Sequence, residues 1–139
     1  MKYTSEYELV FVLNPFKNLK TFLEEENLQF ANNIIEILNE AQVSINDILI
    51  VFGKKDSPKE KNLNTFLFLT KSNIYCLVLL SKQYILSSFF KYDIEFNKCT
   101  LEQCNNSISI FNHISDFPFC FNFINSFTAS IFLDVIKKM

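Results

Sequence analysis

Seven short apolar runs follow one another between residues 45 and 124, and one amphipathic segment, residues 127–139, comes after them. Runs of this length, separated by polar turn residues, predict strands. They comprise residues 48–52, 64–71, 73–82, 84–90, 94–101, 107–111 and 117–124. Strands in succession followed by a single helix indicate a small closed or nearly closed sheet, a scaffold that is used mainly for binding.

Two of these runs are apolar on both faces. Residues 64–71 and 73–82 flank the polar turn Lys71-Ser72-Asn73, which predicts a β-hairpin. One face of such a hairpin lines the interior of a sheet, and the other face needs a cover of its own. The helix expected near the N-terminus is the first candidate for that cover, and a partner subunit is the second.

The N-terminal part of the chain has a helical pattern. Thr21 and Glu24 match the T-x-x-E capping box that begins many helices, and apolar residues recur at helical spacing from residue 23 to residue 41. We therefore expect one long helix or two short ones between residues 15 and 41. Residues 3–13 fit either a strand or the start of a helix, because periodicity is ambiguous over so few positions.

The last strand and the last helix both supply core residues in this interpretation. Four phenylalanines of the last strand share one parity and so point to one face, which predicts a core position for Phe117, Phe119, Phe121 and Phe123. Ser126 is the expected N-cap of the final helix. The apolar stripe of that helix comprises Phe127, Ile131, Phe132, Val135 and Ile136.

Composition argues against several classes of function. The chain has 13 Lys, no Arg and 15 acidic residues, for a net charge of −2, whereas nucleic-acid binders usually carry a basic excess and use Arg. The longest apolar run, residues 74–80, has seven residues, and a membrane-spanning helix needs about 20. The N-terminus has two glutamates where a signal peptide would be apolar. We expect a cytoplasmic protein that binds no nucleic acid.

No catalytic or metal-binding motif occurs in the chain. The chain has four cysteines, Cys76, Cys99, Cys104 and Cys120, and no C-x-x-C pair. Its single histidine is His113. We therefore expect reduced, mostly buried thiols and no metal or other cofactor. His113 with Asp116 and a thiol of Cys120 or Cys104 is the nearest approach to a catalytic group. A lone histidine in a polar turn is usually solvated. We therefore expect a protein that is not an enzyme.

The order of strands and final helix resembles that of the pleckstrin-homology superfold, in its bacterial PH or GRAM-like variety. The likeness covers residues 48–139; residues 66–77, FLFLTKSNIYCL, are similar to a hairpin of those domains, and residues 90–111 are similar to the strands that follow it. The chain departs from those domains in two ways. The position of the usual basic residue in the hairpin turn corresponds to Asn73 or Lys71, and the C-terminal helix has no Trp. The resemblance implies one domain, residues 1–139, with a helical extension (1–44) packed on a PH-like core (45–139).

The fold class we predict is α+β: an N-terminal helical segment, an antiparallel PH-like barrel or strongly curved sheet of about seven strands, and a C-terminal helix across one end. The resemblance implies a non-enzymatic module that binds a lipid headgroup, a peptide or another protein. In lipid-binding members, basic residues of the first two strands and their loop surround the headgroup. The matching positions here are Lys54, Lys55, Lys59 and Lys61. Asp56 and Glu60 dilute the charge of this loop, so a solvated loop is its simpler interpretation.

Three functions follow from these patterns. The first is a subunit for protein–protein interaction or assembly, which could be a homodimer, because of the two-sided apolar strands; it predicts association that salt does not weaken. The second is a peripheral membrane module that binds anionic lipid headgroups through the Lys54–Lys61 loop and weakens with salt. The third is a small, acidic, dimeric chaperone of the secretion type, which stays open because a short run such as residues 84–90 can also be helical.

Overall fold

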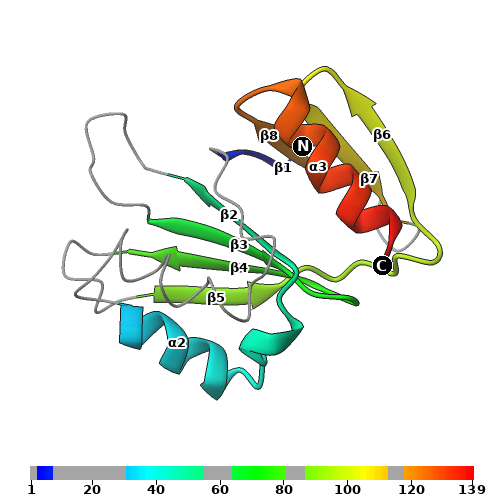
Figure 1. The fold of residues 1–139 in the computed structure, drawn as a ribbon. Helices are drawn as coiled ribbons and strands as arrows, with labels where there is room; N and C mark the ends of the chain where they lie inside the picture. Colours follow the sequence, from blue (N-terminus) through cyan, green and yellow to red (C-terminus); the bar gives the residue numbers. More distant parts are fainter. Residues whose placement is uncertain (1–2, 8–30, 55–63, 81–86, 113–117) are drawn as a thin grey trace. The chain divides into compact units, whose positions relative to one another are not determined.

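The structure is a computed structural model, and it describes residues 3–7, 31–54, 64–80, 87–112 and 118–139 (Figure 1). These residues group into two compact units. One unit is Val10–Tyr92, and the other combines Met1–Leu9 with Asp93–Met139. The expected division into an extension (1–44) and a core (45–139) stays a prediction. That the chain is a single domain stays a prediction.

The Val10–Tyr92 unit contains a four-stranded antiparallel sheet, in the order β2-β3-β4-β5 (Figure 1). Its strands are β2 (Ile50–Lys54), β3 (Thr65–Leu69), β4 (Ile74–Leu79) and β5 (Ser87–Lys91). The Thr70 backbone N–H donates to the Asn73 carbonyl at 3.0 Å and closes the turn between β3 and β4. The predicted hairpin is therefore confirmed.

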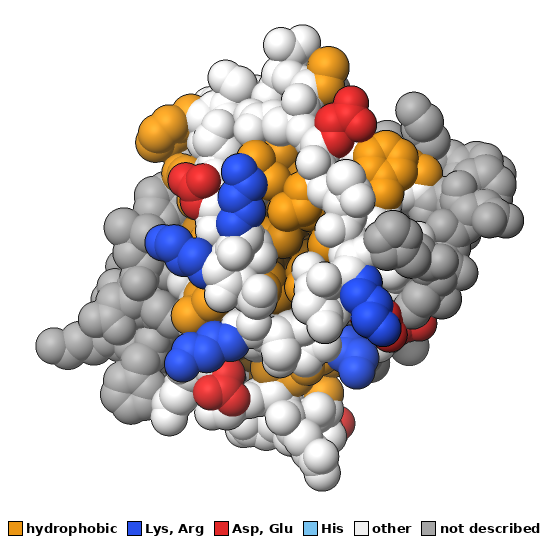
Figure 2. Space-filling model, turned by 90° about the vertical axis from the view of Figure 1, so that its right-hand side faces the viewer, with side chains coloured by type: hydrophobic (Ala, Val, Ile, Leu, Met, Phe, Trp, Pro, Cys, Tyr) orange, Lys and Arg blue, Asp and Glu red, His pale blue; other side chains and the backbone are white. Residues whose placement is uncertain are grey.

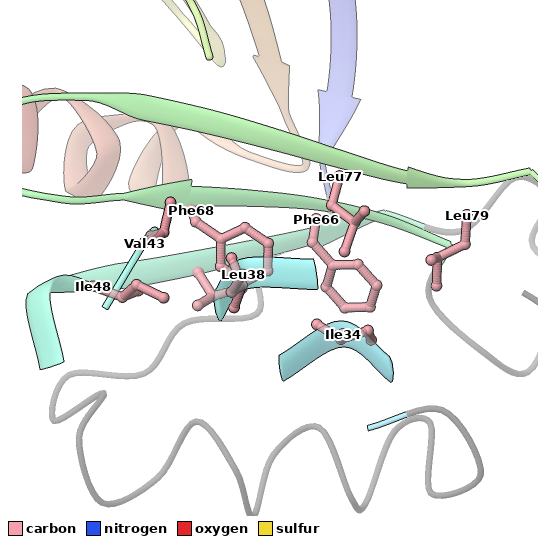
Figure 3. Packing of buried hydrophobic residues seen from close by; sticks show 9 residues of the cluster. Ile34, Leu38, Val43, Ile48, Phe66, Phe68, Leu77 and Leu79 are labelled. Atoms are coloured by element: carbon pink, nitrogen blue, oxygen red, sulfur yellow. The ribbon is translucent and has the colours of Figure 1, made fainter. Parts of the chain in front are cut away.

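Helix α2 (Ala31–Glu40) covers one face of this sheet, and the 3-10 helix η1 (Ile45–Asp47) follows it. Figure 3 shows Ile34 and Leu38 of α2 against apolar side chains of the hairpin, all fully buried or nearly so. These partners are Phe66, Phe68, Leu77 and Leu79. The predicted helical cover is confirmed for residues 31–40, whereas residues 15–30 lie outside the described residues.

The opposite face of the sheet, away from α2, is made by the residues that alternate with Phe66, Phe68, Leu77 and Leu79 along the strands, and these residues are buried as well. They include Ile50, Phe52, Leu67, Leu69, Ile74 and Cys76, none of them more than 3% exposed. Both faces of the predicted two-sided strands are thus buried within a single chain. That a partner subunit also binds this chain stays a prediction.

The second unit contains another four-stranded sheet, in the order β1-β8-β7-β6. Strands β6 (Thr100–Cys104), β7 (Ser107–Phe111) and β8 (Phe119–Phe123) are antiparallel, and β1 (Tyr3–Tyr7) joins β8 in parallel. Residues 3–7 of the ambiguous N-terminal segment therefore form a strand, and residues 8–13 lie outside the described residues. Helix α3 (Ser126–Lys137) packs on β6, β7 and β8.

Aromatic side chains join α3 to its sheet. The Phe132 ring lies 5.2 Å from that of Phe121 and 4.8 Å from that of Phe123. Of the four phenylalanines predicted to share a core face, Phe121 and Phe123 are buried and Phe119 is half-buried. Phe117 lies outside the described residues. The predicted core role is confirmed for the two buried rings.

The α+β class, the antiparallel strands and the C-terminal helix are confirmed, but the expected closed barrel or single curved sheet is wrong for the described strands. They form two sheets, and no ladder joins one to the other. Strand β5 is an edge strand of its sheet, and the segment that connects it to β6 of the other sheet forms a turn where a strand was predicted. In this turn Lys98 N–H donates to the Glu95 carbonyl at 2.9 Å, and their side chains form an ion pair. Because of it, the run predicted at residues 94–101 becomes a strand only at Thr100.

The start of α3 differs from the prediction in two ways. The N-cap is Asn125, not Ser126: its Oδ1 accepts hydrogen bonds from Thr128 N and Oγ1, both at 2.8 Å. Phe127 is 66% exposed, although it was expected in the apolar stripe. Residues five apart are about 140° apart around a helix, so Phe127 cannot share the buried stripe of Phe132. That stripe follows four-residue spacing through Thr128, Phe132 and Ile136.

None of the helices in the described ranges combines the length and the apolar character that crossing a bilayer requires.

Candidate functional site

The predicted lysine site is described at one of its four positions. Lys54 ends β2, is half-buried, and its backbone carbonyl accepts a hydrogen bond from Asn64 N at 2.9 Å. Lys55, Lys59 and Lys61 lie outside the described residues, so headgroup binding by this loop stays a prediction. Figure 2 shows a face of the molecule on which lysine and acidic side chains are interspersed, and no single-sign patch is visible there.

The candidate catalytic residues are also only partly described. His113 and Asp116 lie outside the described residues. Cys120 is buried with its Sγ 3.4 Å from Ser109 Oγ, whereas Cys104 is exposed, contrary to the expectation of mostly buried thiols. In the described part of the chain, no three His, Cys, Asp or Glu side chains come together as a metal site would need.

The surroundings of Cys99 change the acidity of its thiol. Burial raises the pKa of the Cys99 thiol above its ordinary value, and a smaller effect of the backbone N–H of Cys99 itself, which donates to the sulfur, lowers it. Its Sγ donates to the Phe96 carbonyl at 3.4 Å. Because the thiolate is the nucleophile, a raised pKa makes this side chain less reactive.

Exposed apolar side chains gather at the turn between β8 and α3. Ile124 is 60% exposed and Phe127 is 66% exposed, and they lie three residues apart on this one turn. The other large hydrophobic side chains exposed in the described residues are separate in the sequence: Leu80 directly follows β4, Phe90 lies in β5 and Phe111 lies in β7. We call the turn Ile124–Phe127, together with the neighbouring β6–β7 turn at Asn105-Asn106, the apolar tip.

Hydrogen bonds tie the two turns of the apolar tip together. Asn106 exchanges two of them with Phe123: the Phe123 N–H donates to the Asn106 carbonyl at 2.8 Å, and Asn106 Nδ2 donates to the Phe123 carbonyl at 2.6 Å. The Asn125 cap then fixes the first turn of α3. Exposure of Ile124 and Phe127 is therefore a property of a well-tied turn, because the residues on both sides of it are held.

Gln103 adds a second link between the two turns. Its Nε2 donates to the Asn105 carbonyl at 3.1 Å, to Ser130 Oγ at 3.2 Å and, at the longer distance of 3.5 Å, to the Ser126 carbonyl. One amide group thus connects β6, the Asn105-Asn106 turn and α3. Preorganisation of this kind lowers the entropy that is lost when a surface binds its partner.

The apolar tip carries no charge. None of the residues from Gln103 to Ser107 or from Ile124 to Thr128 is Asp, Glu, Lys, Arg or His. A surface with apolar side chains and polar but uncharged neighbours can lose its water without leaving a charge unpaired. It fits an uncharged, apolar surface on whatever it binds.

Sequence reasoning missed this feature for a specific reason. It placed Ile124 in the last strand and Phe127 in the stripe of the last helix, because each fits the apolar pattern of its own element. The signal that could have found the tip is Asn125, which is as good an N-cap as Ser. A second signal is the five-residue spacing between Phe127 and Phe132, which places the two side chains about 140° apart around the helix.

Neither a protein-family model, nor a curated protein, nor a solved structure matches this chain.

Proposed function

We propose that this protein is a non-enzymatic binding module that recognises another protein through its apolar tip. The observation that carries the proposal is the exposure of Ile124 and Phe127, 60% and 66%, on a turn held by hydrogen bonds. An aromatic or aliphatic anchor that fills a pocket of the partner often supplies most of the binding energy of an interface. A rigid turn presents such anchors at a small cost in entropy.

A protein partner fits the apolar tip better than a lipid bilayer does. Burying one Ile or one Phe side chain stabilises a complex by about 1.5–3 kcal/mol. Even a whole myristoyl chain gives only marginal membrane binding, so two side chains alone hold a protein on a bilayer weakly. The tip also offers no lysine to attract anionic headgroups. A protein pocket, by contrast, adds shape complementarity and hydrogen bonds to the polar neighbours of the two anchors.

The order of the elements supports a pleckstrin-homology-like fold as the scaffold of this tip. Strands β2 to β8 are antiparallel to their sequence neighbours within each sheet, and α3 follows them. Binding of a peptide or protein by a non-enzymatic domain is what the resemblance implies, so the fold proposal and the function proposal agree.

Site-specific photo-crosslinking tests the proposal. The crosslinking amino acid p-benzoylphenylalanine is placed at Phe127 and, as a matched control, at Phe111, which is also an exposed phenylalanine of the same unit. In the cells that make the protein, we expect one discrete protein adduct from position 127 and none from position 111. The adduct is identified by mass spectrometry, and the identified protein is then purified and mixed with the chain.

Other outcomes would contradict the proposal and point elsewhere. Adducts of two copies of the chain would indicate self-association, as in the homodimer and chaperone alternatives. Lipid adducts, or sedimentation with anionic vesicles that salt abolishes, would favour the membrane module with Lys54, Lys55, Lys59 and Lys61. Equal adducts from positions 127 and 111 would show that the tip has no special role.

A further inference from the structure

A groove of about 280 Å³ lies in the Val10–Tyr92 unit, and none of its lining residues belongs to the apolar tip. One wall comes from the connection between α2 and η1, residues 42–47, and the other from the β3–β4 turn and the start of β4, residues 70–75. Val43 and Thr70 are its most buried lining residues, and Tyr75 is half-buried with its ring stacked on Phe89 at 5.7 Å. The remaining lining side chains are polar or charged.

Hydrogen bonds of its own fix the wall at residues 42–47. The end of α2 forms a Schellman motif: Val43 N donates to the Leu38 carbonyl at 2.9 Å, and Gln42 N donates to the Asn39 carbonyl at 3.0 Å. Gln42 takes the left-handed conformation that this motif requires, with φ 61°. The chain then turns into η1, where Ser44 Oγ accepts from Asn46 N at 3.3 Å.

The opposite wall is held just as closely. Thr70 Oγ1 accepts a hydrogen bond from Asn73 N at 3.2 Å, and Asn73 Nδ2 donates to Ser72 Oγ at 3.0 Å. Both walls therefore keep their shape without a ligand between them, because each is stabilised by bonds within its own turn.

The two walls carry opposite charges. Asp47 lines the groove from the first wall, Lys71 lines it from the second, and both side chains are exposed. They do not pair with each other: the ion pair recorded within the described residues joins Glu95 and Lys98, at 3.5 Å. Hydroxyl and amide groups of Ser44, Ser72 and other polar residues lie on the same walls. One cation and one anion thus face a single space, with hydrogen-bonding groups between them.

We propose that this groove binds a ligand that carries one carboxylate and one ammonium group. Its carboxylate pairs with Lys71 and its ammonium group pairs with Asp47. This chemistry belongs to a free amino acid and also to a peptide segment with neighbouring acidic and basic side chains. The site is separate from the apolar tip, so it stands whether or not the tip binds a protein.

Ligands of a single charge fit the groove less well. A phosphate group would gain one lysine and be repelled by Asp47. A divalent cation such as Ca²⁺ takes about 6–8 oxygen ligands, and this groove has one carboxylate with an ammonium group opposite. A zwitterion satisfies both charges at once, which is the reason for choosing it.

NMR titration of the ¹⁵N-labelled protein tests this proposal. The probes are 4-aminobutyrate, with butyrate and butylammonium as matched single-charge controls. We expect saturable shifts of groove amides, such as those of Ser44 and Ser72, with the zwitterion only. Exposed charge contacts are weak, so the dissociation constant should be of millimolar order. Removing one charge, by Lys71→Gln or Asp47→Asn, should weaken binding about fivefold.

The charge-exchanged variant sharpens the test. In the double variant Lys71→Asp with Asp47→Lys, the zwitterion can bind in the reverse direction, so most of the affinity should return. Glycine and the capped dipeptide acetyl-Glu-Lys-amide then distinguish a free amino acid from a chain segment as the source of the chemistry. Equal shifts with butyrate or butylammonium, no saturable shift with any zwitterion, or unchanged affinity in both single variants would overturn the proposal. Because no residue of the apolar tip is substituted or used as a reporter, these results do not depend on whether the tip binds a protein.

Discussion

Gln42, at the end of α2, has a backbone conformation that is unfavourable for a residue with a Cβ atom. Its φ of 61° lies in the left-handed region, which costs a residue with a Cβ atom roughly 1–2 kcal/mol. Glycine adopts this conformation freely but loses more entropy on folding. We expect Gln42→Gly to raise the free energy of unfolding by about 0.5–1 kcal/mol, as measured by urea denaturation.

The control for this variant is Glu36→Gly, which replaces an exposed residue in the middle of α2. Glycine there should lower the free energy of unfolding by about 0.5–1 kcal/mol. If both variants lost stability, the left-handed end of α2 would not be a point of strain.

The four thiols should react in an order set by exposure and acidity. Cys104 is exposed, Cys99 is half-buried with a raised pKa, and Cys76 and Cys120 are buried. A raised pKa leaves less thiolate at a given pH and so slows alkylation. Iodoacetamide at mildly alkaline pH should modify Cys104 first, Cys99 more slowly, and the other two only on unfolding, as followed by intact mass. Cys99 reacting as fast as Cys104 would contradict the burial described above.

At the scale of elements, α2 stabilises the Val10–Tyr92 unit by covering its sheet. Leu38 is fully buried between the helix and the strands (Figure 3). Leu38→Ala should lower the free energy of unfolding by about 2–5 kcal/mol, because a cavity is left where the side chain was. The same substitution at Leu80, which is 61% exposed, should change it by less than about 0.5 kcal/mol. A loss at Leu38 as small as the one at Leu80, in thermal or urea denaturation, would mean that α2 is not part of the core.

The start of α3 offers a second test at this scale. Asn125→Ala removes the acceptor for Thr128 N and Oγ1 and should lower the free energy of unfolding by about 1 kcal/mol. Asn125→Asp keeps an acceptor and should cost much less. Ser126→Ala, at the cap position expected from the sequence, should have a small effect; a larger effect there than at Asn125 would restore the original prediction.

For the molecule as a whole, local patterns were informative and pairing between distant strands was not. Each of the seven apolar runs overlaps a strand, since short apolar segments between polar turns form strands in many contexts, although the run at residues 94–101 shares only its last two residues with β6. The two-sheet arrangement depends on the turn at Glu95–Lys98, which the apolar pattern of residues 94–101 conceals. Closure of a sheet depends on which edges meet, and hydrophobic periodicity holds no information about that.

The functional surfaces were hidden for a related reason. Phe127 fits an apolar helical stripe with Ile131 by its four-residue spacing, but the buried stripe of α3 runs through Thr128, Phe132 and Ile136 and leaves Phe127 exposed. The groove was hidden because Asp47 and Lys71 are 24 positions apart in the sequence and meet only when the α2–η1 connection lies beside the β3–β4 turn. Sites assembled by tertiary structure leave no local signal.

The most direct test is the affinity of the purified partner captured at Phe127. It is measured by titration calorimetry against the wild type, Phe127→Asp and the matched exposed control Leu80→Asp, at low and at physiological salt. An anchor in an apolar pocket predicts at least about 30-fold weaker binding for Phe127→Asp. Leu80→Asp should bind as the wild type does, and salt should have little effect, because the tip carries no charge. Binding that survives Phe127→Asp, or that salt abolishes, would contradict recognition through the apolar tip.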